Sequence, residues 1–389
     1  MVSVPDQVVA RWNAATTGVP APFVVVDLDA LEANADDLVR RATWRPVRVA
    51  SKSVRCRWVL DHVLGRPGFS GVMAYAVAEA VWLVAGGVRD VLVAYPSVDV
   101  VALREVAGDE ELRREVTVTI DSVEHVDWLL EVLGHDESGL GVAVDVDASV
   151  RVGRLHLGVR RSPTRTPEEA VAVVRAATKA GLDVRGLVFY DAQVAGLPDT
   201  GPHVRLLKRR SDAELPARRA AVVSAVRDEV ELRFVNGGGT GSLHRFGGDD
   251  AVTELAAGSG LYGPTLFDRY DGFTPRPAMA FAVPVVRRPA PGIVTAYGGG
   301  YVASGEPGWS RVPSPARSAW SLLRTEAVGE VQTPVRGPDV DRLRLGDRVW
   351  LRGAKAGELL ERFDSVHVVR GSAPVAEVAT YRGEGRNFG

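Results

Sequence analysis

The 389-residue sequence has a single cysteine, Cys56, which excludes an intrachain disulfide framework. Its seven histidines are scattered, with no HxH or HxxxH pair that would predict a metal site. The formal net charge of −2 gives no reason to expect nucleic acid or an anionic membrane as a partner. The most apolar segment, residues 71–96, is interrupted by charges, and the N-terminus lacks a secretion pattern, so we expect a cytoplasmic protein.

Lysine is scarce, with four residues beside 43 arginines. One of the four, Lys52, comes at the end of a short apolar run that we interpret as a strand over residues 47–51. A lysine amine can lose its proton when desolvated and attack a carbonyl, whereas a guanidinium cannot. Lys52 is therefore a candidate nucleophile; the alternative is a surface lysine that follows an edge strand.

Eight apolar runs predict strands, and helical patterns lie in most of the gaps between them. The predicted strands are 47–51, 69–75, 91–95, 116–120, 141–146, 185–190, 232–236 and 253–257. The predicted helices are 56–64, 77–86, 99–114, 123–133, 167–181 and 212–228, and residues 194–211 are interpreted as a surface loop. Continuous apolar runs are typical of parallel strands covered on both faces, so we expect an α/β fold with a closed (β/α)₈ TIM-like barrel. A seven-stranded or open sheet is the alternative.

The sequence pattern changes near residue 273, where prolines begin to separate short segments that we interpret as strands. We expect three parts: residues 1–29 with a helix and a strand, residues 30–272 with the barrel, and residues 273–389 as an all-β domain. In the first part, Asp29 is the expected N-cap of a helix that ends near Arg41. The strands expected in the last part are 279–286, 292–297, 326–332, 348–351, 365–369 and 375–379.

Functional groups in a (β/α)₈ barrel lie at the carboxyl ends of the strands. Besides Lys52, the groups predicted there are Asp145 and Asp147, then Tyr190, Asp191 and Gln193, then residues 236–242, and finally residues 256–263. The last two segments are glycine-rich, so their backbone N–H groups can approach and hold an anion. A phosphate site and a strand-end lysine together favour pyridoxal 5′-phosphate (PLP) as cofactor. The alternative is that Gly237–Gly239 simply forms a tight turn.

The sequence also resembles a known family of enzymes. The matching motifs are Pro22–Asp29, Ala50–Lys52, Ala78–Ala80, Asp90–Pro96, Gly237–Thr240 and Gly258–Gly263. They resemble the fold-type III PLP enzymes, the alanine racemase N-terminal superfamily, and within it the D-threonine aldolase and D-serine dehydratase branch that includes actinobacterial amino acid deaminase/aldolases. The resemblance implies an N-terminal strand that joins the C-terminal β domain and a head-to-tail homodimer that shares two active sites.

The resemblance also implies roles for individual residues. Lys52 matches the Schiff-base lysine, and Tyr190 matches a strand-end tyrosine near the cofactor. The residues that match the phosphate-binding loops are Gly238, Gly239, Thr240, Gly258 and Ser259. Either Arg151 or His156 matches the position near the cofactor's phenolic oxygen. The arginine that contacts the pyridine nitrogen in alanine racemase falls on Ala256.

The metal site of this branch is where the sequence departs most from the resemblance. The histidine position falls on Gly353 and the Cys/Asp position on Lys355, and an upstream Glu-Glu-His-Gly motif is replaced by Glu330–Thr333. Glycine and a lysine ammonium cannot form that site, so we predict no metal there. Lys355 is a candidate for a catalytic positive charge in its place; the alternative is a solvated loop lysine.

The resemblance implies a PLP-dependent lyase that cleaves or dehydrates a D-3-hydroxy amino acid. One alternative is a racemase or epimerase, with Lys52 and a residue such as Tyr301 as the two bases. Another is a PLP-binding protein without turnover, which the long C-terminal β domain disfavours. The sequence does not specify the substrate's side chain beyond Cβ, nor which of these reactions occurs.

Overall fold

A computed structural model describes residues 2–134 and 139–389. The chain forms two compact units. The barrel unit contains Leu38–Lys52, Leu64–Gly258 and Phe388–Gly389, and the sheet unit contains the residues up to Asp37, Ser53–Val63 and Ser259–Asn387. The expected domain limits at residues 29 and 272 stay a prediction.

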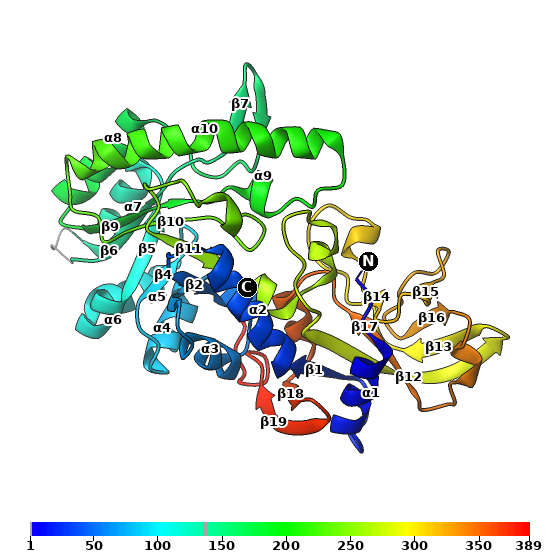
Figure 1. Ribbon diagram of the computed structural model, residues 1–389. Helices are drawn as coiled ribbons and strands as arrows, with labels where there is room; N and C mark the ends of the chain where they lie inside the picture. The colour runs from blue at the N-terminus through cyan, green and yellow to red at the C-terminus, as the bar shows by residue number, and fades with distance from the viewer. Residues whose placement is uncertain (1, 135–138) are drawn as a thin grey trace. The chain divides into compact units, whose positions relative to one another are not determined.

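The barrel unit is a closed ring of eight parallel strands (Figure 1). Around the ring the strands follow in the order β10 (Phe234–Gly237), β11 (Glu254–Ala257), β2 (Val47–Ala50), β3 (Phe69–Ala74), β4 (Val91–Val93), β5 (Val116–Ile120), β6 (Gly141–Asp145) and β9 (Asp183–Phe189). These are the eight runs that the sequence predicted, so the closed barrel is confirmed and the open sheet is wrong. Every neighbouring pair is parallel, which places all eight carboxyl ends at one rim.

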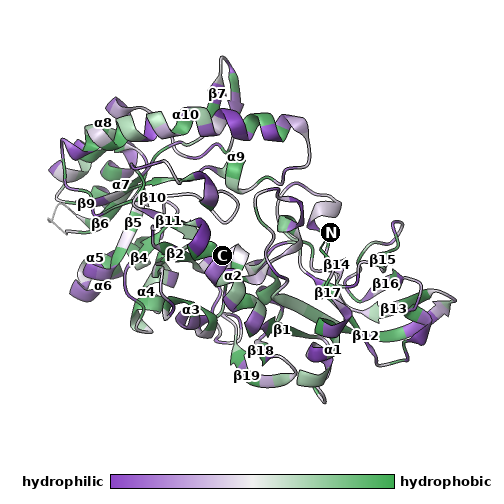
Figure 2. Cartoon of the chain, viewed as in Figure 1, coloured by the Kyte–Doolittle hydropathy of each residue, from purple (hydrophilic) through white to green (hydrophobic). Residues whose placement is uncertain are grey.

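Helices that carry both hydrophilic and hydrophobic residues connect the barrel strands, which are mainly hydrophobic (Figure 2). They are α2 (Leu28–Arg41), α3 (Arg57–Leu64), α4 (Val77–Ala85), α5 (Val100–Gly108), α6 (Glu110–Glu115), α7 (Val123–Leu133) and α8 (Pro167–Lys179). The single helix expected over 99–114 is two helices. Asp109 is extended and its side chain accepts a hydrogen bond from Leu112 N at 2.8 Å, so it ends α5 and caps α6.

The loop expected at residues 194–211 is wrong, because most of that segment is helical. A short helix, α9 (Ala192–Ala195), is followed by α10 (Pro202–Arg227), which has 26 residues. Pro202 lies in the first turn of α10, where a missing N–H costs nothing, and the following leucine, lysine and arginine residues are good helix formers. A hairpin of β7 (Val150–Val152) and β8 (Leu155–Leu157) also follows β6, and the sequence did not predict it.

Charged residues fill part of the barrel where glycines make room. The buried Arg48 of β2 donates to Glu254 at 2.7 Å and 2.9 Å and to Asp90 Oδ2 at 2.9 Å. A Cβ at Gly71 on the neighbouring strand would lie 2.5 Å from the Arg48 guanidinium. The ion pairs satisfy a guanidinium that would otherwise be costly to bury.

The sheet unit is built on a nine-stranded, mainly antiparallel sheet. Its strands are β1 (Phe23–Asp27), β12 (Met279–Ala290), β13 (Ile293–Tyr297), β14 (Ser314–Pro315), β15 (Ser321–Leu322), β16 (Gln332–Arg336), β17 (Arg348–Arg352), β18 (Ser365–Arg370) and β19 (Ala373–Ala379). The N-terminal strand β1 pairs with β12 antiparallel and with β18 parallel. The helix α1 (Asp6–Ala15) packs on this sheet through Trp12, whose indole N–H donates to Asp27 at 2.8 Å. The prediction of a barrel followed by a β domain is confirmed.

Two local predictions in this unit are wrong. The strand expected at 326–332 lies further along, in β16, because Ala327 has a left-handed φ of 55° that an extended ladder cannot accommodate. Helix α2 begins at Leu28, one residue before the expected cap Asp29. Asp27 takes the capping role, since its Oδ1 accepts from Ala30 N at 3.1 Å, while Asp29 accepts from Gly371 N. In the described ranges, we find no helix with the length and apolar character that crossing a bilayer requires.

Candidate active site

The rim at the carboxyl ends of the barrel strands gathers polar side chains from several strands. Lys52 follows β2, Tyr95 follows β4, Asp145 ends β6 and Tyr190 follows β9. The glycine-rich segment begins with Gly237, the last residue of β10, and continues after the strand. The closed parallel topology puts these groups on one rim, where active sites of such barrels are built.

Lys52 is exposed and sits in the one-turn 3₁₀ helix Ser51–Ser53 at the end of β2. The Ser51 hydroxyl donates to the Met73 carbonyl at 3.1 Å and so ties this turn to β3. Lys52 Nζ donates to the Tyr95 hydroxyl at 2.6 Å and lies 5.0 Å from the centre of the Tyr95 ring. The amine is thereby held at a phenol oxygen on the rim, in reach of solvent.

A guanidinium lies over two tyrosine rings at the same rim. The Arg161 guanidinium carbon is 5.0 Å from the centre of the Tyr190 ring and 5.6 Å from that of Tyr95. Both distances fit cation–π interactions. Burial raises the pKa of Tyr190 to about 12, although the charge of Arg161 opposes this shift. Tyr190 is therefore a neutral phenol near pH 7.

Asp145 carries a carboxyl group with an unusual affinity for its proton. Burial raises the pKa of Asp145 to about 7, repulsion from Asp121 adds to the shift, and Arg161 opposes it. Asp121 follows β5 and is paired with His125 Nδ1 at 2.9 Å. A carboxyl that changes protonation near neutral pH at this rim can accept or donate a proton.

The glycine loop after β10 is shaped by close packing. Gly238 has a left-handed φ of 74°, and a Cβ on Gly239 would lie 2.8 Å from the Ala195 Cβ and 3.4 Å from the Tyr190 ring. The Gly239 N–H donates to the Ser242 hydroxyl at 3.1 Å, and the Thr240 carbonyl accepts from Arg41 at 2.8 Å. The loop is thus fixed beside Tyr190 and has little room for larger side chains.

The remaining predicted cofactor residues lie where the chain leaves the barrel unit. Gly258 is buried directly after β11 and is the last residue of that segment of the barrel unit. Ser259 begins the short helix α11 (Ser259–Tyr262) in the sheet unit. Ala256 is buried in β11 and has no polar side chain for a pyridine nitrogen.

Lys355 belongs to the sheet unit. Its Nζ donates to the Ser304 hydroxyl at 2.9 Å and lies 3.4 Å from Glu358 Oε1. The Ser304 hydroxyl in turn donates to Glu358 at 2.6 Å, and the Ser304 N–H donates to the same carboxylate at 2.7 Å. The hydrogen bonds to Ser304 help to lower the pKa of Glu358 despite partial burial, so it is an anion beside the lysine.

The two residues proposed for the phenolic oxygen have other partners in the structure. Arg151 pairs with Asp147 at 3.0 Å, and the His156 ring bonds to the Val159 carbonyl at 3.0 Å. Arg161 occupies the rim beside Tyr190 instead. The sequence reasoning missed Arg161 because the hairpin β7–β8 separates it from β6 and removes any regular spacing. Tyr95 could have been found, since it ends the predicted strand 91–95.

Comparisons with known proteins agree with this architecture. Two curated 3-hydroxy-D-aspartate aldolases, from Paracoccus denitrificans strain Pd 1222 and from Paracoccus denitrificans, are 27% and 28% identical over 246 and 247 residues. Each match covers 62% of this chain and spans 60% of the length of the relative.

Solved structures share the fold over nearly the whole chain. D-threonine aldolase from Filomicrobium marinum has a TM-score of 0.78 at 24% identity, covering 94% of this chain and 96% of its own. D-threo-3-hydroxyaspartate dehydratase from Delftia sp. HT23 has a TM-score of 0.76 at 17% identity, covering 93% and 98%. Alanine racemase from Bacillus anthracis has a TM-score of 0.63 at 16% identity, covering 94% and 99%. The family model described as alanine racemase, N-terminal domain, matches residues 26–265, and the chain belongs to this family.

Proposed function

We propose that the protein is a PLP-dependent lyase that acts on a D-3-hydroxy amino acid, by retro-aldol cleavage or by elimination of water. The observation that carries the proposal is Lys52, whose Nζ is exposed at the end of β2 and bonded to the Tyr95 hydroxyl at 2.6 Å. The family is PLP-dependent, and the relatives named above with the highest TM-scores or sequence identities are aldolases and a dehydratase, whereas the alanine racemase has a lower TM-score. Lysine is the side chain that can bind an aldehyde cofactor covalently.

The residues of the barrel rim fit PLP. The loop Gly238–Thr240 approaches α9 and Tyr190 so closely that a Cβ at Gly239 would fill the gap, and such a loop offers backbone N–H groups to a phosphate. Lys52 offers an amine, and Arg161 offers a positive charge beside Tyr190. We propose that Lys52 and Tyr190 hold the cofactor ring, and that Gly238, Gly239, Thr240, Gly258 and Ser259 surround its phosphate.

When bound, PLP supplies an electron sink for the negative charge that develops at the substrate's Cα. Side chains of the protein must then donate and accept the protons that the reaction moves. Tyr95 accepts a hydrogen bond from Lys52 Nζ and so orients the amine. The neutral Tyr190 hydroxyl can donate a hydrogen bond, and Asp145 is able to take up or release a proton near pH 7.

The residues at the relatives' metal position do not fit a metal ion. Gly353 has no side chain, and the ammonium of Lys355 is already bonded to Ser304 and lies near Glu358. Across residues 2–134 and 139–389, no group of three or more His, Cys, Asp or Glu side chains could hold a metal. A variant of D-threo-3-hydroxyaspartate dehydratase with the same fold has a structure in a metal-free form. We therefore predict that the protein binds no metal at this position. We propose that Lys355 supplies a catalytic positive charge there.

Homodimer formation is part of the proposal, because the family resemblance implies a head-to-tail dimer that completes two active sites. Light scattering of the purified protein should then give twice the 41.6 kDa mass of the chain.

A substrate panel tests the proposed reaction. Purified protein with PLP is incubated with D-threonine, 3-hydroxy-D-aspartate, D-serine and D-alanine, and aldehyde, keto acid and enantiomer are followed separately. We expect aldehyde or keto acid from at least one hydroxy amino acid and no product from D-alanine. Formation of L-alanine from D-alanine would contradict the lyase and support a racemase.

A further inference from the structure

A buried hydrogen-bonded chain lies behind the glycine loop. The Ser242 hydroxyl donates to Asp191 Oδ1 at 3.1 Å, and the same hydroxyl accepts from the Gly239 N–H at 3.1 Å. The Ser242 N–H donates back to the Gly239 carbonyl at 2.9 Å. Asp191 is 3% exposed and Ser242 is fully buried, so no solvent competes for these bonds.

We propose that Asp191 is a positioning residue that sets the phosphate-binding loop through Ser242; this inference rests on the proposed PLP cofactor. A serine hydroxyl has one proton to donate and lone pairs to accept with. Asp191 is the nearer of two acceptors for the Ser242 proton, at 3.1 Å against 3.4 Å for the Gly239 carbonyl, so the Asp191 carboxylate orients the hydroxyl with its lone pairs free for the Gly239 N–H. The Gly239 N–H is then occupied by Ser242 within the loop. The phosphate is bound by the backbone N–H groups of the residues next to Gly239.

Asp191 also sets the other wall of the same loop. Its backbone carbonyl accepts from Val194 N at 2.8 Å and from Ala195 N at 2.9 Å, which forms the short helix α9. The Ala195 Cβ is the atom that a side chain at Gly239 would meet at 2.8 Å. One residue, directly after Tyr190, therefore fixes both the packing surface and the hydrogen bonding of the loop.

The charges around Asp191 come from α10. Burial raises the pKa of Asp191 to about 7, and the charge of Arg219 together with the bond from Ser242 opposes the shift, while Asp212 adds to it. Arg219 is itself paired with Asp249 at 2.6 Å and Asp212 with Arg245. Arg219 and the bond from Ser242 thus offset part, but not all, of the cost of burying the carboxylate form that orders the loop.

Affinities for two aldehydes test this role without relying on catalysis. PLP and pyridoxal differ in the phosphate, so a residue that acts through the phosphate loop should affect PLP alone. In Ser242→Ala, which removes both bonds, we expect PLP affinity to fall about tenfold or more and pyridoxal affinity to stay within about twofold. Asp191→Asn keeps the volume and one acceptor, so its loss should be smaller and in the same direction.

Ser122→Ala is a matched control. The Ser122 hydroxyl caps α7 in the same unit, so this variant should lose stability while keeping wild-type affinity for both aldehydes. Equal losses of PLP and pyridoxal in Ser242→Ala and Asp191→Asn, or no loss in either, would overturn the positioning role. A wild-type protein that binds PLP and turns over no hydroxy amino acid would overturn the lyase but leave this test intact. A wild-type protein that binds neither aldehyde would overturn both.

Discussion

The barrel rim around Lys52 and the turn that carries Lys355 both present a lysine, but they hold it in different ways. Lys52 bonds to the hydroxyl of Tyr95, with a guanidinium over the same ring. Lys355 lies beside the Glu358 carboxylate and bonds to a serine that donates to that carboxylate. The carboxylate partner holds Lys355 in an ion pair, whereas the phenol partner orients Lys52 Nζ without such a pair. The scarcity of lysine makes each lysine of the chain a candidate for chemistry. The hydrogen-bonding partners of Lys52 and Lys355 then distinguish a candidate nucleophile from a candidate catalytic charge.

Replacing Lys52 should have the largest effect on function. Lys52→Ala removes the amine that we propose for cofactor attachment and proton transfer, so turnover should fall about a thousandfold or more. The absorption of bound PLP at the visible edge of the ultraviolet should also shift to that of the free aldehyde. Lys179→Ala, at the exposed end of α8, is the matched control and should leave turnover and spectrum unchanged.

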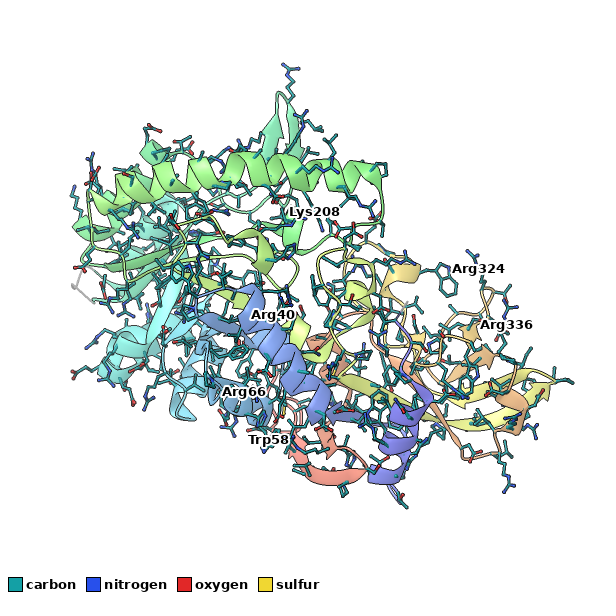
Figure 3. The ribbon with its side chains drawn as sticks, in the orientation of Figure 1. Arg40, Trp58, Arg66, Lys208, Arg324 and Arg336 are labelled. Atoms are coloured by element: carbon teal, nitrogen blue, oxygen red, sulfur yellow. The ribbon has the colours of Figure 1, made fainter. Side chains whose placement is uncertain are left out.

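A third lysine sharpens the comparison because it is buried. Lys208 on α10 (Figure 3) is 1% exposed and its Nζ is 2.8 Å from Asp199. Lys208→Met would leave Asp199 as a buried charge without this ion pair, so the free energy of unfolding should fall by about 3–5 kcal/mol. Urea unfolding measures the change. The double variant Lys208→Met with Asp199→Leu should recover much of it, and no recovery would mean that packing rather than charge explains the loss.

Asp145 gives the rim a pH dependence with a defined sign. Its pKa in the folded protein is raised to about 7 from 3.8, so the folded state binds the proton more tightly than the unfolded state. Stability from this group is complete below pH 4 and is lost as the pH rises to 7. Asp145→Asn should therefore stabilise the protein at pH 8 by about 2–4 kcal/mol. At pH 4 the two proteins should unfold at similar urea concentrations; an equal gain at both pH values would contradict the raised pKa.

Gly239 tests the packing of the rim. In Gly239→Ala the new Cβ would lie 2.8 Å from the Ala195 Cβ, which is held by α9 and cannot move away cheaply. We expect a loss of about 1–3 kcal/mol in the free energy of unfolding and weaker binding of PLP. Gly248→Ala is the control, because its Cβ would meet no atom within 4 Å. Similar behaviour of the two variants would show that the close approach is not what requires glycine.

Lys355→Met should have the smallest effect on stability. The Lys355 side chain is 33% exposed, and ion pairs of this kind contribute about 0–1 kcal/mol, so thermal unfolding should barely change. If the charge of Lys355 supports catalysis, turnover of the variant should be about tenfold lower than that of the wild type. Turnover of the wild-type protein should be unaffected by chelators. Activity that is lost to a chelator and restored by one equivalent of metal would refute both the role of Lys355 and the absence of a metal.

The fold was predictable where apolar runs are continuous, as in the eight barrel strands, because burial on both faces leaves a clear pattern. The first part of helix α10, residues 202–211, was not, since the glycine, proline and arginine residues of 194–211 are typical of a surface loop; the predicted helix 212–228 forms the second part of α10. Strand β16 was misplaced because the conformation of Ala327 depends on its surroundings. In the candidate site, the strand-end rule placed Lys52 and Tyr190 at the ends of strands, where the structure has them. Arg161 was missed because the hairpin β7–β8 interrupts the regular pattern before it, although the alternation of residues 150–157 around Gly153 is typical of a hairpin.

Peptide mapping tests the central claim most directly. The protein is incubated with PLP, reduced with borohydride and digested, and the modified peptides are identified by mass spectrometry. If Lys52 is the residue that attaches the cofactor, one equivalent of reduced cofactor should be found on the peptide containing Lys52. Labelling of Lys179, Lys208 or Lys355 in its place, or no labelling at all, would contradict the account.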